Sequence, residues 1–468
     1  MAKPRAFVGP LIHSTSVTNL EIIPSALLAI DSSGIITALL PDVDPASTST
    51  ILTSLNFRPS LVEVTHLGPG QFIMPGFVDT HNHAPQFGQR GLGQGMHIID
   101  WLDKITFPNE ARFADTTHAR KVYSQCIDGF LRQGITMASY YASIHGPATK
   151  ILADVCLEKG QRALVGKCNM TANSPDFYIE ASAEESIRVT EDCIAHIRSI
   201  DPEGKLVNPV ITPRFAISCT EETLRVLGDL AKQHPDMAIQ THFNEAEQEM
   251  SFTQKLFPQF DGSEADLYEH FGLLREKTIL AHCCHMSEHE LTKIKALNCG
   301  VAHCPVSNMT VGGGFMAASV REFLRREIKV GLGTDSGGGF SSSMLDAMRQ
   351  AMIASHAREV FSGGKDKGLT VAEVFHLATL GGAEVCGLQD KIGNFAVGKE
   401  FDGLVIGTLG DNQGIMTPVE DGEDTLATIF EKFIMTGDDR NILEVYVRGR
   451  QVKGGLELGW GWPPTSIN

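Results

Sequence analysis

The sequence of 468 residues lacks any hydrophobic run of the ~18 residues that crossing a bilayer requires. Its first residues include positive charge, but Gly9 and Pro10 interrupt the apolar run that follows, so we predict no signal peptide. Basic side chains are few, because 39 Lys and Arg stand against 56 Asp and Glu, for a formal charge of −17. Phosphate would be repelled over most of such a surface. We therefore expect a small-molecule partner rather than nucleic acid or a membrane, and a cytoplasmic location.

Two further motifs are absent. The ten cysteines are scattered from Cys126 to Cys386 without a C-x-x-C pair, and the adjacent Cys283 and Cys284 have poor geometry for a mutual disulfide. Reduced thiols are the simpler interpretation, in keeping with the cytoplasm. No Gly-rich nucleotide fingerprint follows the first buried strand, which argues against a doubly wound dinucleotide-binding sheet.

Short β-rich runs separated by turn residues fill both ends of the chain. Residues 32–34, Ser-Ser-Gly, separate two apolar runs and form a hairpin signature. Residues 401–406 and 445–452 have the pattern of antiparallel strands. Because neither end is long enough for a core of its own, we predict one small β-sandwich domain composed of residues 1–73 and 395–468.

Between these ends, short apolar strands alternate with longer helical patterns. The strand candidates lie at residues 72–79, 135–139, 163–166, 210–212, 238–240, 278–281, 301–302 and 330–333. Eight such β-α units close naturally into a (β/α)8 TIM barrel, an α/β fold that we predict for residues 74–394.

Functional side chains of such barrels follow the C-terminal ends of the strands. His81 and His83 follow the first strand, and alternate residues of an extended segment point the same way, so both imidazoles can bind one metal. The fifth strand ends in His242, the sixth ends in His282, and Asp335 follows the eighth. A single histidine at a strand end is usually structural. The placement of four histidines and one aspartate at the ends of four strands instead predicts a metal site of the catalytic zinc type.

These residues lie within a longer resemblance. The run Met74-Pro-Gly-Phe-Val-Asp-Thr-His-Asn-His83 resembles the first-strand motif P-G-h-h-D-x-H-x-H of the amidohydrolase superfamily, where h is apolar. Residues 241–245, 281–282, 303–308 and 331–335 match its deaminase and chlorohydrolase branch in order. Residues 107–108, 212–215, 343–346 and 437–442 extend the similarity to amidohydrolase-type guanine deaminases, over most of the chain. One departure is Cys283, where the family pattern has a glycine.

Members of the amidohydrolase superfamily bind either one or two metal ions, and the sequence indicates which. Two-metal members of the superfamily use a carboxylated lysine at the end of strand four, but here that strand ends in Arg214, and Lys167 belongs to strand three. The resemblance therefore implies one zinc, with iron as the alternative because nitrogen and oxygen ligands bind both. The ligands it implies are His81, His83, His242 and Asp335. His282 either contacts the water or completes the ligand set.

Glu245 lies three residues after His242, so a turn past strand five can bring it beside the metal-bound water. The alternative is a solvated acid in a run with Glu247 and Glu249. The resemblance implies hydrolytic deamination of guanine to xanthine and ammonia by a zinc-activated hydroxide that attacks C2. Glu245 and Asp335 are expected to transfer protons.

The substrate pocket is expected beside the first histidines. Gln86 offers both donors and an acceptor, Arg214 could donate to the guanine carbonyl, and Phe215 could stack on the ring. The alternatives are a turn amide for Gln86 and a salt bridge for Arg214, and the resemblance favours substrate contact. The predicted substrate contacts are His83, Ala84, Pro85, Gln86, Arg214, Phe215, His242, Glu245 and Asp335.

Three other kinds of protein share parts of this pattern. Sister enzymes of the same fold act on adenosine-like, cytosine, triazine and other heterocycles, and only the pocket separates them from a guanine enzyme. A barrel that lost catalysis would lack ligands, and none is missing. Zinc deaminases of the P-C-x-x-C type are excluded because that motif does not occur. The family also implies a homodimer.

Overall fold

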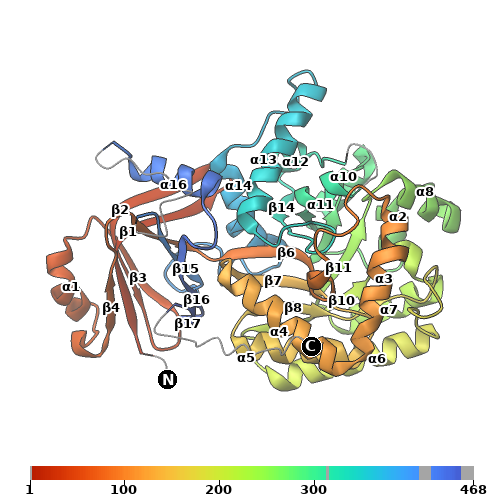
Figure 1. The fold of residues 1–468 in the computed structure, drawn as a ribbon, viewed down its shortest axis with the longest axis horizontal. Coiled ribbons are helices and arrows are strands. Elements are labelled where there is room, and N and C mark those ends of the chain that lie inside the picture. Colours follow the sequence, from red (N-terminus) through yellow and green to blue (C-terminus); the bar gives the residue numbers. More distant parts are fainter. Residues whose placement is uncertain (1–2, 312–315, 410–422, 455–468) are drawn as a thin grey trace, which may run out of the picture.

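Eight parallel strands lie side by side in one of two sheets of the computed structural model, which describes residues 3–311, 316–409 and 423–454 (Figure 1). The strands are β6 (Phe77–His83), β7 (Ile135–Tyr141), β8 (Arg162–Gly166), β10 (Val207–Pro213), β11 (Ala238–Phe243), β12 (Thr278–His282), β13 (Gly300–His303) and β14 (Lys329–Leu332). A short additional strand, β9 (Cys168–Asn169), pairs with β10. Helices surround these strands, and the predicted (β/α)8 barrel is confirmed.

The barrel closes where β14 returns to β6. The Thr80 hydroxyl donates to the carbonyl oxygen of Leu332 at 2.9 Å, and the N–H of Asp335 donates to the carbonyl oxygen of His81 at 3.0 Å. These bonds join the first and last strands. Residues that follow strand one and strand eight in the sequence therefore become neighbours.

Helices begin at recognisable caps. The Asp115 side chain accepts from the N–H of Thr117 at the start of α4, and Ser287 and Glu290 form a capping box on α10. The helices of the described residues are α1 (Thr48–Ser54), α2 (Ile98–Trp101), α3 (Phe107–Ala111), α4 (Thr116–Arg132), α5 (Gly146–Lys159), α6 (Ala183–Ile200), α7 (Glu221–Gln233), α8 (Glu247–Leu256), α9 (Glu264–His270), α10 (Glu288–Ala296), α11 (Pro305–Thr310), α12 (Val320–Arg325), α13 (Met344–Phe361), α14 (Val371–Ala378), α15 (Leu380–Val385) and α16 (Leu426–Thr436). None of these helices is both long enough and apolar enough to span a bilayer.

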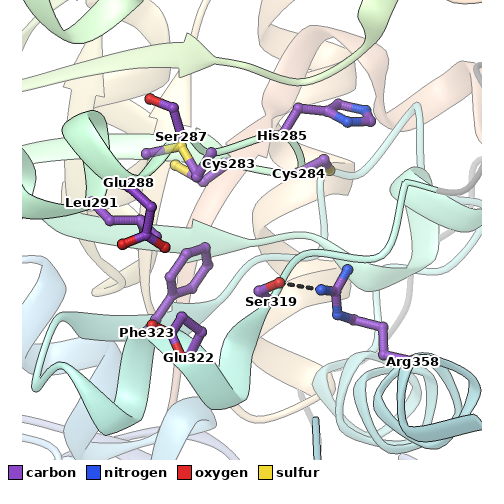
Figure 2. A pocket seen from close by; sticks show the side chains of 11 residues that line it. Cys283, Cys284, His285, Ser287, Glu288, Leu291, Ser319, Glu322, Phe323 and Arg358 are labelled. Atoms are coloured by element: carbon purple, nitrogen blue, oxygen red, sulfur yellow. Dashed lines mark hydrogen bonds between the residues drawn. The ribbon is translucent and has the colours of Figure 1, made fainter. Parts of the chain in front are cut away.

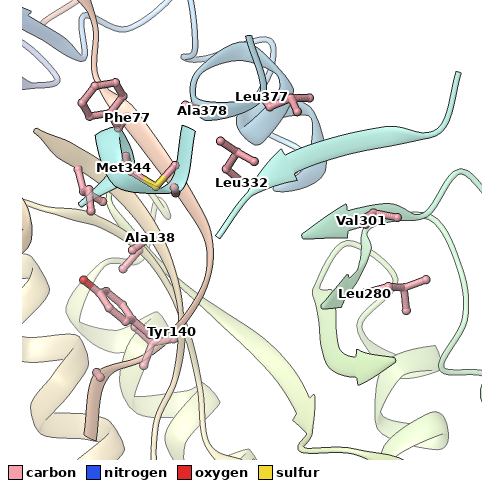
Figure 3. Close-up of a cluster of buried hydrophobic side chains, with 14 of the residues drawn as sticks. Phe77, Ala138, Tyr140, Leu280, Val301, Leu332, Met344, Leu377 and Ala378 are labelled. Carbon is pink, nitrogen blue, oxygen red and sulfur yellow. The ribbon is translucent and has the colours of Figure 1, made fainter. Parts of the chain in front are cut away.

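Apolar side chains pack on both faces of the barrel wall. Inside, near the N-terminal ends of the strands, Val78, Met137 and Ile279 are buried in one cluster that fills the bottom of the barrel. Outside, strand side chains pack against the helices, and Figure 3 shows Leu377 of α14 beside Leu332 of β14. Polar side chains of the barrel interior gather toward the other end of the strands, where the candidate site lies.

The second sheet is made from both ends of the chain, as predicted. Its strands are β1 (Arg5–Ser16), β2 (Asn19–Ile30), β3 (Ile36–Pro41), β4 (Glu63–His66), β5 (Gln71–Pro75), β15 (Gly403–Gly407), β16 (Ile442–Val447) and β17 (Arg450–Lys453). They pair in the order β17-β16-β15-β5-β1-β2-β3, with β4 beside β1. The rings of Phe7 on β1 and Tyr446 on β16 lie 5.3 Å apart, although three spacings of ~4.8 Å separate these strands along the sheet. The sheet therefore curls over its own core, as in a sandwich.

The first predicted strand, residues 72–79, is two strands that belong to different sheets. β5 pairs antiparallel with β15 in the terminal sheet, whereas β6 begins at Phe77 and pairs with β7 in the barrel. The chain crosses at Gly76, where an added Cβ would lie 2.2 Å from the Thr136 hydroxyl oxygen. Both strands are buried, so the sequence shows one continuous apolar run and conceals the break.

A buried ion pair joins the two sheets. Arg162 at the start of β8 is 2% exposed. Its guanidinium donates to both carboxylate oxygens of Asp402 at 3.1 Å and to Oε2 of Glu400 at 2.7 Å. Asp402 directly precedes β15 of the terminal sheet, and Glu400 lies two residues before Asp402. Removing the cation would leave the buried Asp402 carboxylate without its counter-charge.

Replacing Arg162 by methionine should therefore lower the free energy of unfolding by about 3–5 kcal/mol, measured by urea denaturation. The double variant R162M/D402N should recover part of that loss. Arg120→Ala, in the exposed pair with Glu158, is the control and should change the free energy by less than about 1 kcal/mol. Wild-type stability of Arg162→Met would contradict this role.

Candidate active site

The five side chains predicted to bind a metal or its water meet at the C-terminal ends of the barrel strands. They come from β6, β11, β12 and the segment after β14. Each is at most 7% exposed. The residues brought together are His81, His83, His242, His282 and Asp335.

Four of these side chains point their nitrogen or oxygen atoms at one another. His83 Nε2 and His242 Nε2 are 3.1 Å apart. Asp335 Oδ1 is 3.3 Å from His81 Nε2 and 3.5 Å from His83 Nε2. The ligand atoms of His81, His83 and His242 all lie within 4.8 Å of one another. Lone pairs gathered this closely suit a shared cation, and three nitrogens with one carboxylate oxygen are a donor set typical of catalytic zinc.

Hydrogen bonds on the far side of two rings fix their tautomers. His242 Nδ1 donates to the carbonyl oxygen of Arg214 at 2.6 Å, and His282 Nδ1 donates to Oδ1 of Asn308 at 2.8 Å. Because both partners only accept, each ring proton lies on Nδ1 and the Nε2 lone pair faces the cluster. Metal-binding histidines are held in this way.

Burial also sets protonation states that suit a cation. Burial lowers the pKa of His81, and it lowers the pKa of both His83 and His242 well below the usual value. Burial alone would raise the pKa of Asp335, but the hydrogen bond and electrostatic interaction with His81 hold that pKa well below its usual range. Neutral imidazoles and an ionised carboxylate are the forms that bind metals. The residues therefore fit a divalent cation.

Left-handed backbone recurs at the strand ends around the cluster. The φ angles of Asn244, His282, Cys283 and Asp335 are 44°, 75°, 49° and 42°. Such conformations cost non-glycine residues about 1–3 kcal/mol each and gather at functional sites. The angle at Cys283 also explains why the family pattern has glycine there.

Asp79 belongs to the sequence motif, but its role was missed. Its carboxylate accepts from the main-chain N–H and the hydroxyl of Thr334, at 2.9 Å and 2.6 Å, and from Nδ2 of Asn82 at 2.7 Å. Burial raises the pKa of Asp79 to about 6. Thr334 precedes Asp335, and Asn82 lies between the two histidines of β6, so Asp79 holds both halves of the cluster in register.

Glu245 lies at the edge of the cluster. Its Oε2 is 3.6 Å from Nε2 of His282, and burial raises its pKa to about 7. A carboxyl group with a pKa near neutrality can both accept and donate a proton. Glu245 is buried whereas Glu247 is exposed, so the structure disfavours the alternative of a solvated surface acid.

A cavity opens directly above the cluster. Trp101 and Leu102 line it. Seven of the predicted substrate contacts line it as well, namely His83, Gln86, Arg214, Phe215, His242, Glu245 and Asp335. Ala84 and Pro85 are buried in the turn that presents Gln86 and do not line the cavity. Its volume is about 30 Å³.

Sequence reasoning missed Glu110, a buried acid on α3 that contacts two of these side chains. Its Oε2 accepts from the Arg214 guanidinium at 2.6 Å, and its Oε1 accepts from Nε2 of Gln86 at 2.8 Å. The salt bridge considered for Arg214 is therefore present, and Arg214 lines the cavity as well. A buried arginine after strand four requires a carboxylate partner, and this requirement is the signal that could have found Glu110 near the Phe107-Pro108 motif.

Lys167 is separate from the cluster, as its position on strand three predicted. It follows β8, and its amine forms an ion pair with the buried Glu180. Arg214 follows β10, the fourth strand of the barrel. A lysine available to bridge two metals is therefore not found at the end of strand four.

The unusual Cys283-Cys284 pair lines a second cavity, of about 480 Å³, shown in Figure 2. His285, which follows this pair, and Arg358 of α13 also line the cavity, and Arg358 donates to Ser319. The two cavities share no lining residue among those described. All ten cysteines lie in the described residues, and none is paired in a disulfide there.

Comparison with known proteins places this geometry in a family. A family model described as "Amidohydrolase family" matches residues 72–452. Guanine deaminase of Dictyostelium discoideum is 38% identical over 458 residues, covering 96% of this chain and 98% of that protein. Guanine deaminase of Homo sapiens is also 38% identical, over 95% of this chain and 96% of that protein.

A solved guanine deaminase structure has the same fold as this chain. The guanine deaminase from C. acetobutylicum, with guanine bound in its active site, superposes with a TM-score of 0.85 at 30% identity, covering 96% of this chain and 99% of that chain. The chain therefore belongs to the amidohydrolase family and, within it, to the guanine deaminases.

Proposed function

We propose that the enzyme hydrolyses guanine to xanthine and ammonia with one zinc ion per chain. The observation that carries this proposal is the convergence of three imidazoles and a carboxylate at the floor of a cavity that Arg214 and Phe215 also line. The similarity to guanine deaminases supports guanine as the substrate.

The metal would be held by His81, His83, His242 and Asp335. A zinc ion bound by such ligands lowers the pKa of a water molecule to about 7, which makes a nucleophile at neutral pH. Iron is the alternative, since affinity for nitrogen and oxygen ligands does not separate the two metals.

Glu245 and Asp335 are the proton carriers. As the water oxygen forms a bond to C2, the Glu245 carboxylate accepts a proton and delivers it to a ring nitrogen. Asp335 accepts the second proton, which passes to the exocyclic amine as the C2–N bond breaks and ammonia leaves. His282 Nε2, close to Glu245 and with its lone pair toward the cluster, accepts a hydrogen bond from the hydroxyl group that becomes the C2 carbonyl oxygen. Guanine and water thus give xanthine and ammonia.

The remaining contacts orient the ring. Arg214 donates to the guanine carbonyl, and Phe215 packs against the purine face. Phe215 is already perpendicular to His242, with ring centroids 5.6 Å apart, so the purine would lie next to the metal ligands.

Three further assignments rest on the sequence. We propose that the enzyme has the two predicted domains, residues 1–73 with 395–468 and residues 74–394, with the first boundary moved to Gly76 because β5 pairs in the terminal sheet. We also propose that it works in the cytoplasm and as a homodimer. The separate pairing of the two sheets supports the domains. The scattered cysteines suit a reducing compartment, and the family resemblance supports the dimer.

Incubation of the purified, metal-assayed protein with guanine, adenine, cytosine and ammelide tests the substrate. Ammonia release is expected from guanine at a rate far above that from the other three. Release from another heterocycle, with none from guanine, would assign a sister activity of the same fold instead.

Glu245→Gln should leave the metal content unchanged and lower kcat by about 10²–10⁴-fold, because the amide cannot carry the proton. Glu247→Gln, an exposed neighbour on the same segment, is the matched control and should keep wild-type kcat. Metal analysis and steady-state kinetics measure both. Full activity of Glu245→Gln would remove it from the mechanism.

Dialysis against a chelator should abolish ammonia release and remove about one metal ion per chain. Zinc should restore activity to the chelated protein more fully than Fe²⁺. Undiminished activity of metal-free protein would refute metal dependence, and restoration by iron alone would assign iron.

A further inference from the structure

Glu110 is completely buried and lies behind the cavity wall rather than on it. Its two oxygens accept from three side chains: Gln86 Nε2 at 2.8 Å, Arg214 at 2.6 Å and the Tyr178 hydroxyl at 2.6 Å. Gln86 and Arg214 both line the cavity, so one carboxylate is bonded to two side chains that face the substrate.

The carboxylate determines which end of the Gln86 amide it meets. Because an ionised carboxylate only accepts hydrogen bonds, the amide must present its NH2 group to Glu110. Oε1 of Gln86 is then the free end, and among the described residues it has no hydrogen-bond partner although it is buried. Gly337 makes room for this oxygen, since a Cβ there would lie 2.2 Å from it.

Arg214 completes a fixed pattern of donors and acceptors. Its guanidinium only donates, and its buried Nε has no partner within the described part of the chain. A donor from Arg214 beside an acceptor from Gln86 complements a ring edge with a carbonyl next to an N–H. Guanine presents this pattern at O6 and N1. A 6-amino group next to an unprotonated N1 presents the reverse pattern.

We propose that Glu110 is a positioning residue that fixes the Gln86 amide and the Arg214 guanidinium, and thereby makes the pocket select a lactam edge of a purine. The inference rests on the proposed guanine deamination and adds the group that sets its specificity. If Glu110 only neutralised the buried charge of Arg214, its loss would weaken all substrates alike.

The test compares guanine with 2,6-diaminopurine, which has the same 2-amino leaving group and the reversed edge. The wild-type ratio of kcat/KM should favour guanine by about 10³-fold or more, because a reversed edge leaves buried polar groups unpaired. In Glu110→Gln the new amide can donate or accept, so Gln86 is no longer fixed. That ratio should fall by about tenfold or more, with unchanged metal content.

Two matched variants separate positioning from packing. Tyr178→Phe removes the other neutral hydrogen bond to Glu110 without altering the partner of Gln86, so its ratio should stay within about twofold of wild type. Glu110→Asp keeps an acceptor-only carboxylate and should retain most of the selectivity. If Glu110→Gln unfolds in a thermal melt, Gln86→Met tests the step that the proposal requires, namely that the amide held by Glu110 sets the ratio, and it should narrow the ratio.

Each outcome decides the inference. If Glu110→Gln lowers kcat/KM equally for guanine and 2,6-diaminopurine, the inference is overturned while the deaminase assignment stands. The same holds if Gln86→Met leaves the ratio of the two kcat/KM values unchanged. Failure of the wild-type protein to release ammonia from guanine overturns the proposed function and this inference together.

Discussion

The Asp79 carboxylate accepts hydrogen bonds from the end of β6 and from the segment that follows β14, and the arrangement of the site depends on that junction. Asp79 and Thr334 are 255 residues apart in the chain, so they meet only because the barrel closes. Without that closure, Asp335 Oδ1 would not lie 3.3 Å from His81 Nε2. The closure of a parallel barrel is therefore what turns separate strand ends into one ligand set.

Burial supplies the electrostatics that this ligand set needs. Exclusion of water keeps the imidazoles of His83 and His242 neutral, whereas the contact with His81 keeps Asp335 ionised. The left-handed backbone at Asn244, His282 and Asp335 costs stability at the same strand ends. Burial of the apolar core elsewhere offsets such costs. The molecule thus concentrates strain and buried charge where chemistry is expected.

Local patterns in the sequence reveal much of this structure. The alternation of short apolar runs and helical stretches predicted all eight barrel strands, and the strand-end positions predicted which histidines would meet. Pairing between distant residues has no such local pattern. Glu110 was missed because its partner Arg214 is about 100 residues away, and the crossing at Gly76 was missed because both flanking strands are apolar. Hydrogen-bond direction, which orients Gln86, exists only once the chain is folded.

The central claim is that four strand-end groups bind one metal beside Glu245. A crystal structure of the metal-loaded protein, with anomalous data collected on both sides of the zinc edge, tests it most directly. We expect a single peak bonded to His81, His83, His242 and Asp335 at distances of about 2.0–2.2 Å. A peak elsewhere, or two peaks bridged by another residue, would contradict the account.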